Sequence, residues 1–162
     1  MRAVHATEAG GPEVLTVVDL PETAPDPGEV RVQVAGAGVN FIDTYRRGGV
    51  YPIEFPHVVG TEGAGAVVEV GDGVTEFAVG DHVVSTFFPD WLSGEPLIEG
   101  FATVPGDGID GYARETVTAR ATSFTRAPKN WSHAEAATLT TAGLTAWRSL
   151  MADGLLKPGD SV

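Results

Sequence analysis

The 162-residue sequence contains no cysteine. Disulfide bonds, thiolate zinc sites and a cysteine nucleophile are therefore excluded for this chain. Basic residues are scarce as well, since 10 Lys and Arg stand against 22 Asp and Glu, for a formal net charge of -12. A chain this acidic repels nucleic-acid phosphate and anionic membrane surfaces, so we expect neither nucleic acid nor membrane as a partner.

Long hydrophobic runs are absent too. No apolar stretch approaches the length of a membrane span, and the residues that follow Met1 to His5 do not form the apolar core of a signal peptide. We therefore expect a cytoplasmic protein. With 43% hydrophobic residues, the chain can bury one core of ordinary size and should form one domain, or one domain with a short appendage.

Most of the usable polar chemistry lies in one stretch, residues 38–65, where a predicted strand runs into a polar and aromatic loop and returns as a glycine-rich strand. The glycines let the backbone bend and approach other groups closely. Among the polar side chains of this stretch, we single out Asn40, Asp43, Tyr45, Arg46, Tyr51, Thr61 and Glu62.

The first 128 residues predict a mainly β fold. The alternation of Val30, Val32 and Val34 with polar residues is typical of a half-buried strand, and the glycines at 60, 63 and 65 predict a bulge or a barrel corner. A short helix is expected at residues 40–47. Short strands are expected at residues 2–7, 14–20, 30–34, 58–70, 82–88, 112–118 and 123–128. Many short strands with closely spaced turns favour a barrel or a sandwich.

The rest of the chain predicts a long loop and two helices. Residues 89–111 show no periodicity and are expected to form an irregular loop. Ser132 and Glu135 fit a capping box at the start of a helix, and Gly143 is expected to interrupt the helical pattern before a second segment that ends at Gly154. Because Ser161 and Val162 look like the first residues of a strand, we expect the parent protein to continue beyond them.

Two long segments carry a resemblance to a known family. They are VRVQVAGAGVNFIDTYRRGGVYP and VVGTEGAGAVVEVGDGVTEFAVGDHV, and the similarity continues through residues 132–162. The sequence resembles the N-terminal, GroES-like domain of the medium-chain dehydrogenase/reductase superfamily, in its zinc-independent quinone oxidoreductase (zeta-crystallin-like) branch. Residues 89–111 depart from that pattern and are more like zinc-independent alcohol dehydrogenase-like members.

The resemblance implies a domain organisation. A GroES-like, partly open β-barrel with short helices is expected at residues 1–128, and residues 129–162 are expected to be helices that lead into a Rossmann nucleotide-binding domain absent from this chain. The parent is expected to use NADPH or NADH and to form a homodimer, while this chain alone should bind the cofactor weakly and be inactive.

The resemblance also places the three zinc-ligand positions of the metal-dependent relatives at Asn40, Thr61 and Ala142. None of these side chains is a good zinc ligand, so we predict that no metal binds. Without a metal, hydride transfer to an electron-poor quinone or enone is favoured over alcohol oxidation, because such an acceptor needs little more than hydrogen bonds to its carbonyl oxygen.

Candidate site residues follow from the same resemblance. Asn40, Tyr51 and Thr61 are the candidate catalytic residues. The candidate cofactor-binding residues are Asn40, Tyr45, Tyr51, Thr141 and Thr145, and Trp91 is the candidate for the substrate pocket. Simpler roles stay open: Asn40 is common in turns, the tyrosines can serve packing alone, and Trp91 can equally anchor its own loop.

Three functions remain open from the sequence. The first is the catalytic-domain portion of a zinc-independent NAD(P)H-dependent quinone or enone oxidoreductase. The second is another enzyme of the same kind, either an enoyl reductase of lipid or polyketide synthesis or a zinc-independent alcohol dehydrogenase-like enzyme. The third is a stand-alone GroES-like binding module without catalysis.

Overall fold

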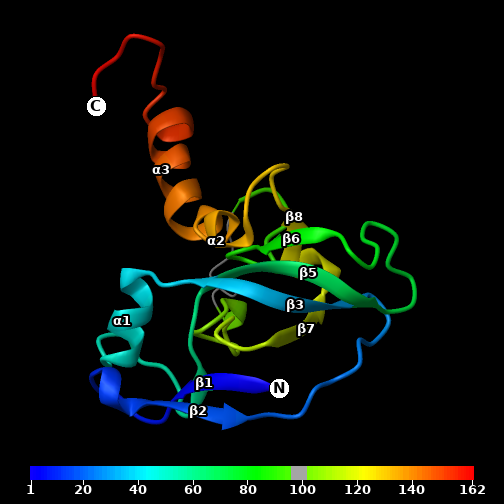
Figure 1. The fold of residues 1–162 in the computed structure, drawn as a ribbon. Coiled ribbons are helices and arrows are strands. Elements are labelled where there is room, and N and C mark those ends of the chain that lie inside the picture. The colour runs from blue at the N-terminus through cyan, green and yellow to red at the C-terminus, as the bar shows by residue number, and fades with distance from the viewer. Residues whose placement is uncertain (96–101) are drawn as a thin grey trace.

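The computed structural model describes residues 1–95 and 102–162, and its core is built from two antiparallel sheets (Figure 1). The smaller sheet has the order β2-β1-β4 and the larger has the order β7-β3-β5-β6-β8. The strands are β1 (Arg2–Ala6), β2 (Leu15–Asp19), β3 (Glu29–Gly38), β4 (His57–Val58), β5 (Glu62–Val70), β6 (His82–Ser85), β7 (Thr116–Arg120) and β8 (Phe124–Arg126). Both sheets are open, which confirms the predicted mainly β, partly open GroES-like architecture.

The strands expected at residues 2–7 and 14–20 correspond to β1 and β2, which form a hairpin and are joined through the short helix η1 (Pro12–Val14). The third strand of this sheet, β4, overlaps the start of the stretch 58–70, which was expected to be a strand interrupted by its glycines at a bulge or a barrel corner. The backbone leaves the sheet at Gly60, which has a positive φ of 102°, and β5 then begins in the other sheet. Glycine reaches this conformation without the steric cost that other residues meet, so the expected strand is divided here.

The larger sheet holds the main hydrophobic core. Val30 and Val32 of β3 are buried, while Arg31 between them points to the other face and pairs with Glu69 of β5 at 2.6 Å. This alternation confirms the half-buried strand. Further buried residues from several strands and loops pack around the valines: Val67, Val83, Tyr112, Val117, Ala121 and Phe124.

A bulge lies between β3 and β5, where the pairing shifts between Val34 and Gly36. Opposite it, Gly65 lies so close to β3 that an added Cβ would be 2.0 Å from the carbonyl oxygen of Gln33. The sequence predicted a bulge or corner from the glycines of β5, and the structure confirms it.

Replacing Gly65 with alanine should lower the free energy of unfolding by about 2 kcal/mol, because the backbone of β3 has to move to admit the methyl group. Urea unfolding measures this. The control is Gly143→Ala in the C-terminal helix, where the nearest atoms to an added Cβ lie at 3.5 Å and φ is helical, so a change of no more than about 1 kcal/mol, in the stabilising direction, is expected. Equal losses in the two variants would contradict this reading of the bulge.

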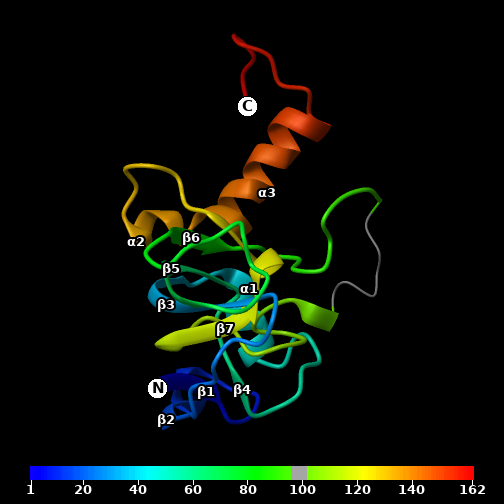
Figure 2. The ribbon, with the colours of Figure 1, turned by 90° about the vertical axis from the view of Figure 1, so that its right-hand side faces the viewer.

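The helices are short or lie at the C-terminal end. Helix α1 (Phe41–Arg47) follows β3, and α2 (His133–Ala136) begins at the predicted capping box, in which the Ser132 amide donates to Glu135 at 2.8 Å. A longer helical segment follows, made of η4 (Leu139–Gly143), α3 (Leu144–Trp147) and η5 (Arg148–Asp153), of which η4 and η5 are π-helical. It extends away from the sheets, at the opposite end from the β1–β2 hairpin (Figures 1 and 2).

The expected helix break at Gly143 was wrong. Gly143 has helical φ and ψ of -62° and -48°, and the helical segment continues through it. The break falls instead after α2, which ends at Ala136, and Thr138, with a φ of -103°, precedes η4. Glycine lowers helix propensity by about 1 kcal/mol without preventing a helix, so its presence alone did not fix the boundary.

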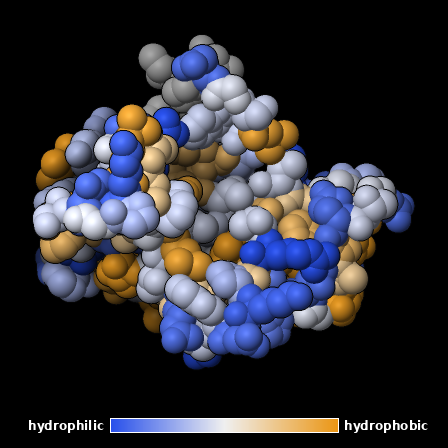
Figure 3. Space-filling view, turned by 90° about the horizontal axis from the view of Figure 1, so that it is seen from above, coloured by the Kyte–Doolittle hydropathy of each residue, from blue (hydrophilic) through white to orange (hydrophobic). Residues whose placement is uncertain are grey.

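The helical segment leaves several apolar side chains uncovered by the described residues. Leu144 and Trp147 are 55% and 63% exposed. From above, the surface shows hydrophobic residues in separate patches between hydrophilic ones (Figure 3).

Among the described residues no helix combines the length and the apolar character that a membrane crossing requires.

Two histidines should make stability depend on pH. Burial lowers the pKa of His57, an effect that the nearby Asp110 carboxylate opposes, and burial together with the His82 ring, whose centroid lies 4.5 Å away, lowers the pKa of His133. In the folded protein these two histidines therefore become protonated only at a lower pH, whereas in the unfolded chain they take up protons below about pH 6.5.

The thermal midpoint should therefore fall as the pH drops below about 6.5, before the carboxylates with lowered pKa values, such as Glu135, begin to titrate below about pH 4.5. Calorimetry at a series of pH values measures this. The double variant His57→Asn/His133→Asn should have a flatter profile between about pH 7 and pH 5. An unchanged slope in the double variant would show that other groups cause the dependence.

Candidate functional site

Asn40 lies at the junction of β3 and α1, and hydrogen bonds hold both its backbone and its side chain. Its backbone N–H donates to Asp43 Oδ2 at 2.8 Å, as expected for a residue that precedes a helix with an acid in the first turn. Its side-chain Nδ2 donates to Glu62 Oε1 at 2.9 Å. The amide is partly exposed and its orientation is fixed, so its second N–H is available to a ligand, while its side chain also takes part in the capping box with Asp43.

Glu62 joins Asn40 to the C-terminal helical segment. This carboxyl group is only 2% exposed. Its Oε2 accepts a hydrogen bond from the backbone N–H of Thr141 at 2.7 Å and another from the Thr140 hydroxyl at 3.1 Å. The three donors come from two segments far apart in the sequence, so the site is held together by one side chain.

Thr61 is fully buried beneath this region. Its hydroxyl donates to Asp43 Oδ1 at 2.5 Å and accepts from Arg46 Nη1 at 2.9 Å. Arg46 is itself buried and its Nη2 pairs with Asp107 at 2.8 Å. A contact between Thr61 and substrate stays a prediction, and within the described structure the hydroxyl has already used its only proton.

Tyr45 and Tyr51 lie side by side at the surface of α1 and the segment that follows it. Their ring centroids are 6.4 Å apart in an edge-to-face arrangement, and the Phe41 ring lies 6.4 Å from Tyr45 on the other side. Both tyrosines are nearly half exposed, and neither hydroxyl has a hydrogen-bond partner within residues 1–95 and 102–162. Such an aromatic group can stack on a planar ring and donate hydrogen bonds.

Thr141 and Thr145 are one helical turn apart. The Thr145 hydroxyl donates to the Thr141 carbonyl at 2.6 Å, while the Thr141 hydroxyl is buried and has no hydrogen-bond partner among the described residues. A buried hydroxyl without a partner is uncommon, because leaving it unpaired costs free energy. The Thr141 hydroxyl therefore fits a hydrogen bond to a bound group.

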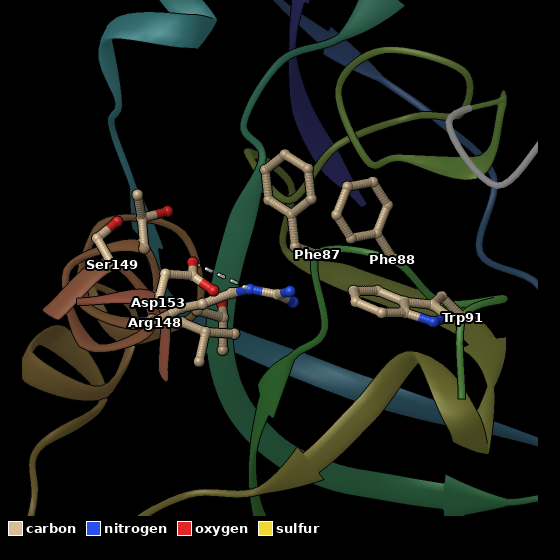
Figure 4. A pocket seen from close by; sticks show the side chains of 9 residues that line it. Phe87, Phe88, Trp91, Arg148, Ser149 and Asp153 are labelled. Carbon is tan, nitrogen blue, oxygen red and sulfur yellow. Dashed lines mark ion pairs between the residues drawn. The ribbon is translucent and has the colours of Figure 1, made fainter. Parts of the chain in front are cut away.

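A pocket of about 420 Å³ opens between the helical segment and the loop after β6 (Figure 4). Trp91 lies in it with its ring 6.0 Å from that of Phe88 and 5.9 Å from the Arg148 guanidinium, which points toward it in the figure. The indole N–H donates to the Gly94 carbonyl at 3.0 Å. Trp91 thus both lines a pocket and holds its own loop. The lining residues are Phe87, Phe88, Trp91, Thr140, Leu144, Thr145, Arg148, Ser149 and Asp153.

The pocket meets the Asn40 region through Thr140, which lines the pocket and donates to Glu62. Sequence reasoning selected Trp91 and Thr145 but missed Phe87, Phe88 and Arg148. The available signals were the aromatic pair directly before Pro89 and the spacing of four residues between Leu144 and Arg148, which places both on one helix face. Part of the predicted loop 89–111, residues 96–101, lies outside the described residues.

A metal does not suit the three predicted ligand positions. The amide of Asn40 donates to Glu62, the hydroxyl of Thr61 is used by Asp43 and Arg46, and Ala142 carries no donor atom. In the part of the chain that the structure describes, no three His, Asp or Glu side chains are grouped so that they could hold an ion.

Comparisons with known sequences place these features in a family. The family model of the alcohol dehydrogenase GroES-like domain matches residues 26–129. A zinc-type alcohol dehydrogenase-like protein of Schizosaccharomyces pombe is 37% identical over 141 residues, 85% of this chain and 41% of that protein. A quinone oxidoreductase of Pseudomonas aeruginosa is 46% identical over 105 residues, 62% of this chain and 32% of that protein. A polyketide synthase of Streptomyces halstedii is 39% identical over 141 residues, 86% of this chain and 2% of that protein.

Solved structures agree with the sequence relatives. The crystal structure of an NAD-dependent alcohol dehydrogenase has a TM-score of 0.85 at 37% identity and covers 99% of this chain and 49% of that one. The Escherichia coli quinone oxidoreductase complexed with NADPH has a TM-score of 0.73 at 30% identity and covers 93% of this chain and 40% of that one. The chain thus spans less than half the length of these relatives. By its fold and sequence it belongs to the alcohol dehydrogenase GroES-like domain family, within the medium-chain dehydrogenase/reductase superfamily.

Proposed function

We propose that this chain is the catalytic-domain portion of a zinc-independent, NAD(P)H-dependent oxidoreductase that reduces quinones or activated enones by hydride transfer. The observation that carries the proposal is the fixed amide of Asn40, held by Glu62 and Asp43. It lies next to the helical segment whose Thr140 also lines an aromatic pocket. The similarity to quinone oxidoreductases supports the same function.

In the proposed reaction, the side chains of this chain transfer neither the hydride nor the proton. NADPH, when bound, supplies a hydride ion, and a proton from solvent completes the reduction of the acceptor. Negative charge develops on the acceptor's carbonyl oxygen as the hydride arrives, and the free N–H of Asn40 can stabilise it by donating a hydrogen bond. A neutral amide does this without a change of protonation.

The cofactor has suitable partners on this chain. The hydroxyls of Thr141, Tyr45 and Tyr51, which have no hydrogen-bond partner among the described residues, are candidates to hold the nicotinamide half. Thr145, one helical turn from Thr141, lines the pocket. The remaining contacts would come from a nucleotide-binding domain outside the chain, which we propose begins after the helical segment 129–162 and follows a GroES-like domain at residues 1–128.

The substrate is proposed to enter the pocket between Trp91 and the helical segment. Its walls are mostly apolar, with the aromatic rings of Phe87, Phe88 and Trp91 on one side. Such walls suit a flat, electron-poor ring, which can stack on them while water is excluded from the reacting atoms.

We also propose that the parent protein is a cytoplasmic homodimer. The strong negative charge of this chain gives it no attraction to nucleic acid or anionic membranes.

An enoyl reductase of polyketide or lipid synthesis is the second candidate, supported by the similarity to a polyketide synthase. The two enzymes differ in the acceptor that they reduce. NADPH oxidation by the full-length protein should therefore be followed with 1,4-benzoquinone, an α,β-unsaturated ketone and an enoyl thioester. We expect the quinone or the ketone to be reduced fastest. Preference for the thioester would favour the second candidate, and no oxidation with any acceptor would favour a binding module without catalysis.

A further inference from the structure

Glu62 is a buried carboxyl group for which the proposed reaction has no direct use. It is 2% exposed, and no ion pair that includes it is formed within residues 1–95 and 102–162. Burying a carboxylate without a cation is costly unless hydrogen bonds replace the lost water. A side chain kept in this state generally enforces one arrangement of its neighbours.

The neighbours of Glu62 are the two sides of the candidate site. Oε1 accepts from Asn40 Nδ2 at 2.9 Å. Oε2 accepts from Thr141 N at 2.7 Å and from Thr140 Oγ1 at 3.1 Å. A movement of the helical segment would thus be transmitted to Asn40 through one rigid carboxyl group.

The surrounding backbone is shaped to allow this contact. A Cβ on Gly38 would lie 2.7 Å from Glu62 Oε1 and 2.5 Å from the carbonyl oxygen of Ala137. Only a glycine at this position lets the end of β3 lie against both the carboxyl group and the end of α2. The packing of three segments on Glu62 is therefore part of the local fold and not a chance surface contact.

The direction of the Asn40 amide follows from the chemistry of its partner. A carboxylate oxygen accepts hydrogen bonds and does not donate them, so Asn40 must present its NH₂ group to Glu62. The remaining N–H and the amide oxygen are then fixed in position. With a glutamine at position 62, the side chain could donate as well, and both orientations of Asn40 would become possible.

We infer that Glu62 is a positioning residue, which acts through Asn40 by fixing the orientation of its amide and tying it to the helical segment. It does not touch the substrate. This inference rests on the proposed function for its kinetic consequence, but the orientation of the amide can be observed without any activity.

The test uses Glu62→Gln, which preserves the size of the side chain. In ¹⁵N NMR spectra of this chain, the side-chain NH₂ signals of Asn40 should shift and exchange faster with water in the variant. In the full-length protein, kcat for quinone reduction should fall by about tenfold or more with little change in KM for NADPH. The matched control is Glu69→Gln, because Glu69 lies on the same strand and pairs with Arg31, away from Asn40. It should leave both readouts unchanged.

A double-mutant cycle separates positioning from a general structural effect. If Glu62 acts through Asn40, then adding Glu62→Gln to an Asn40→Ala variant should not lower kcat further. An equal loss in both backgrounds, or unshifted Asn40 signals, would overturn the inference.

If the wild-type protein reduces no quinone, the proposed function fails while the NMR result still decides the role of Glu62. Should Glu62→Gln not fold, Glu62→Asp replaces it: the shorter side chain cannot reach both segments, so the same signals must still shift.

Discussion

Replacing Arg46 with methionine should lower the free energy of unfolding by about 3 kcal/mol, because it breaks a buried ionic network. Arg46 donates to the Thr61 hydroxyl at 2.9 Å and to Asp107 at 2.8 Å. Asp43 belongs to the same network because its carboxylate accepts a hydrogen bond from the Thr61 hydroxyl. Without the guanidinium, the buried hydroxyl loses a donor and two carboxylates lose their nearby cation. Urea unfolding of the purified chain measures the loss.

The adjacent arginine provides the control for this experiment. Arg47 is partly exposed and its Nε donates only to the Gly10 carbonyl, at 3.2 Å. Its replacement by methionine removes the same charge but should cost no more than about 1 kcal/mol. Similar losses for the two variants would mean that charge and helix composition, and not the buried network, explain the effect.

Replacing Asn40 with alanine should lower kcat/KM for quinone reduction by about 100-fold, the loss expected when one donor to a developing oxyanion is removed. The reason is that Glu62 fixes the direction of the Asn40 side-chain N–H, and the same carboxyl group accepts a hydrogen bond from Thr140, which lines the pocket. Initial rates of NADPH oxidation by the full-length protein measure the effect. The free energy of unfolding should be measured in parallel, since the variant also leaves Glu62 Oε1 without its donor, while Oε2 keeps its hydrogen bonds from Thr140 and Thr141.

Gln33→Ala is the matched control for Asn40→Ala. Gln33 is an amide on β3, the strand that leads to Asn40, but its side chain donates to the Glu115 carbonyl at 2.8 Å, on the edge where β3 pairs with β7. It should leave kcat/KM within about twofold of the wild type, as expected for a residue remote from the reaction. If the two variants lose the same activity, Asn40 has no special part in hydride transfer.

Local patterns were enough to predict much of this fold. The alternation of Val30, Val32 and Val34 was sufficient for a half-buried strand, and the serine and glutamate of the capping box marked the start of α2. These features depend on neighbours within a few residues. Gly143 shows the limit of such rules, because a glycine weakens a helix without deciding where it ends.

The candidate site was harder to predict because its contacts join distant segments. Arginine is seldom fully buried, so nothing local indicated that Arg46 would lie under the site with Asp107, 61 residues along the chain. In the same way, Thr61 was expected to face a ligand, whereas the structure gives its hydroxyl two partners inside the protein. The role of Glu62 as a link between Asn40 and Thr141 also depends on the tertiary packing.

The most direct test of the proposed zinc-independent mechanism is the rate of NADPH oxidation with 1,4-benzoquinone by the full-length protein, before and after dialysis against EDTA, with bound zinc quantified in both samples. Asn40, Thr61 and Ala142 stand at the positions that the family resemblance assigns to zinc ligands, and none of them is a good ligand, so we expect the same rate in both samples and well below one zinc ion per chain. A rate that disappears after dialysis and returns when Zn²⁺ is added would contradict the mechanism.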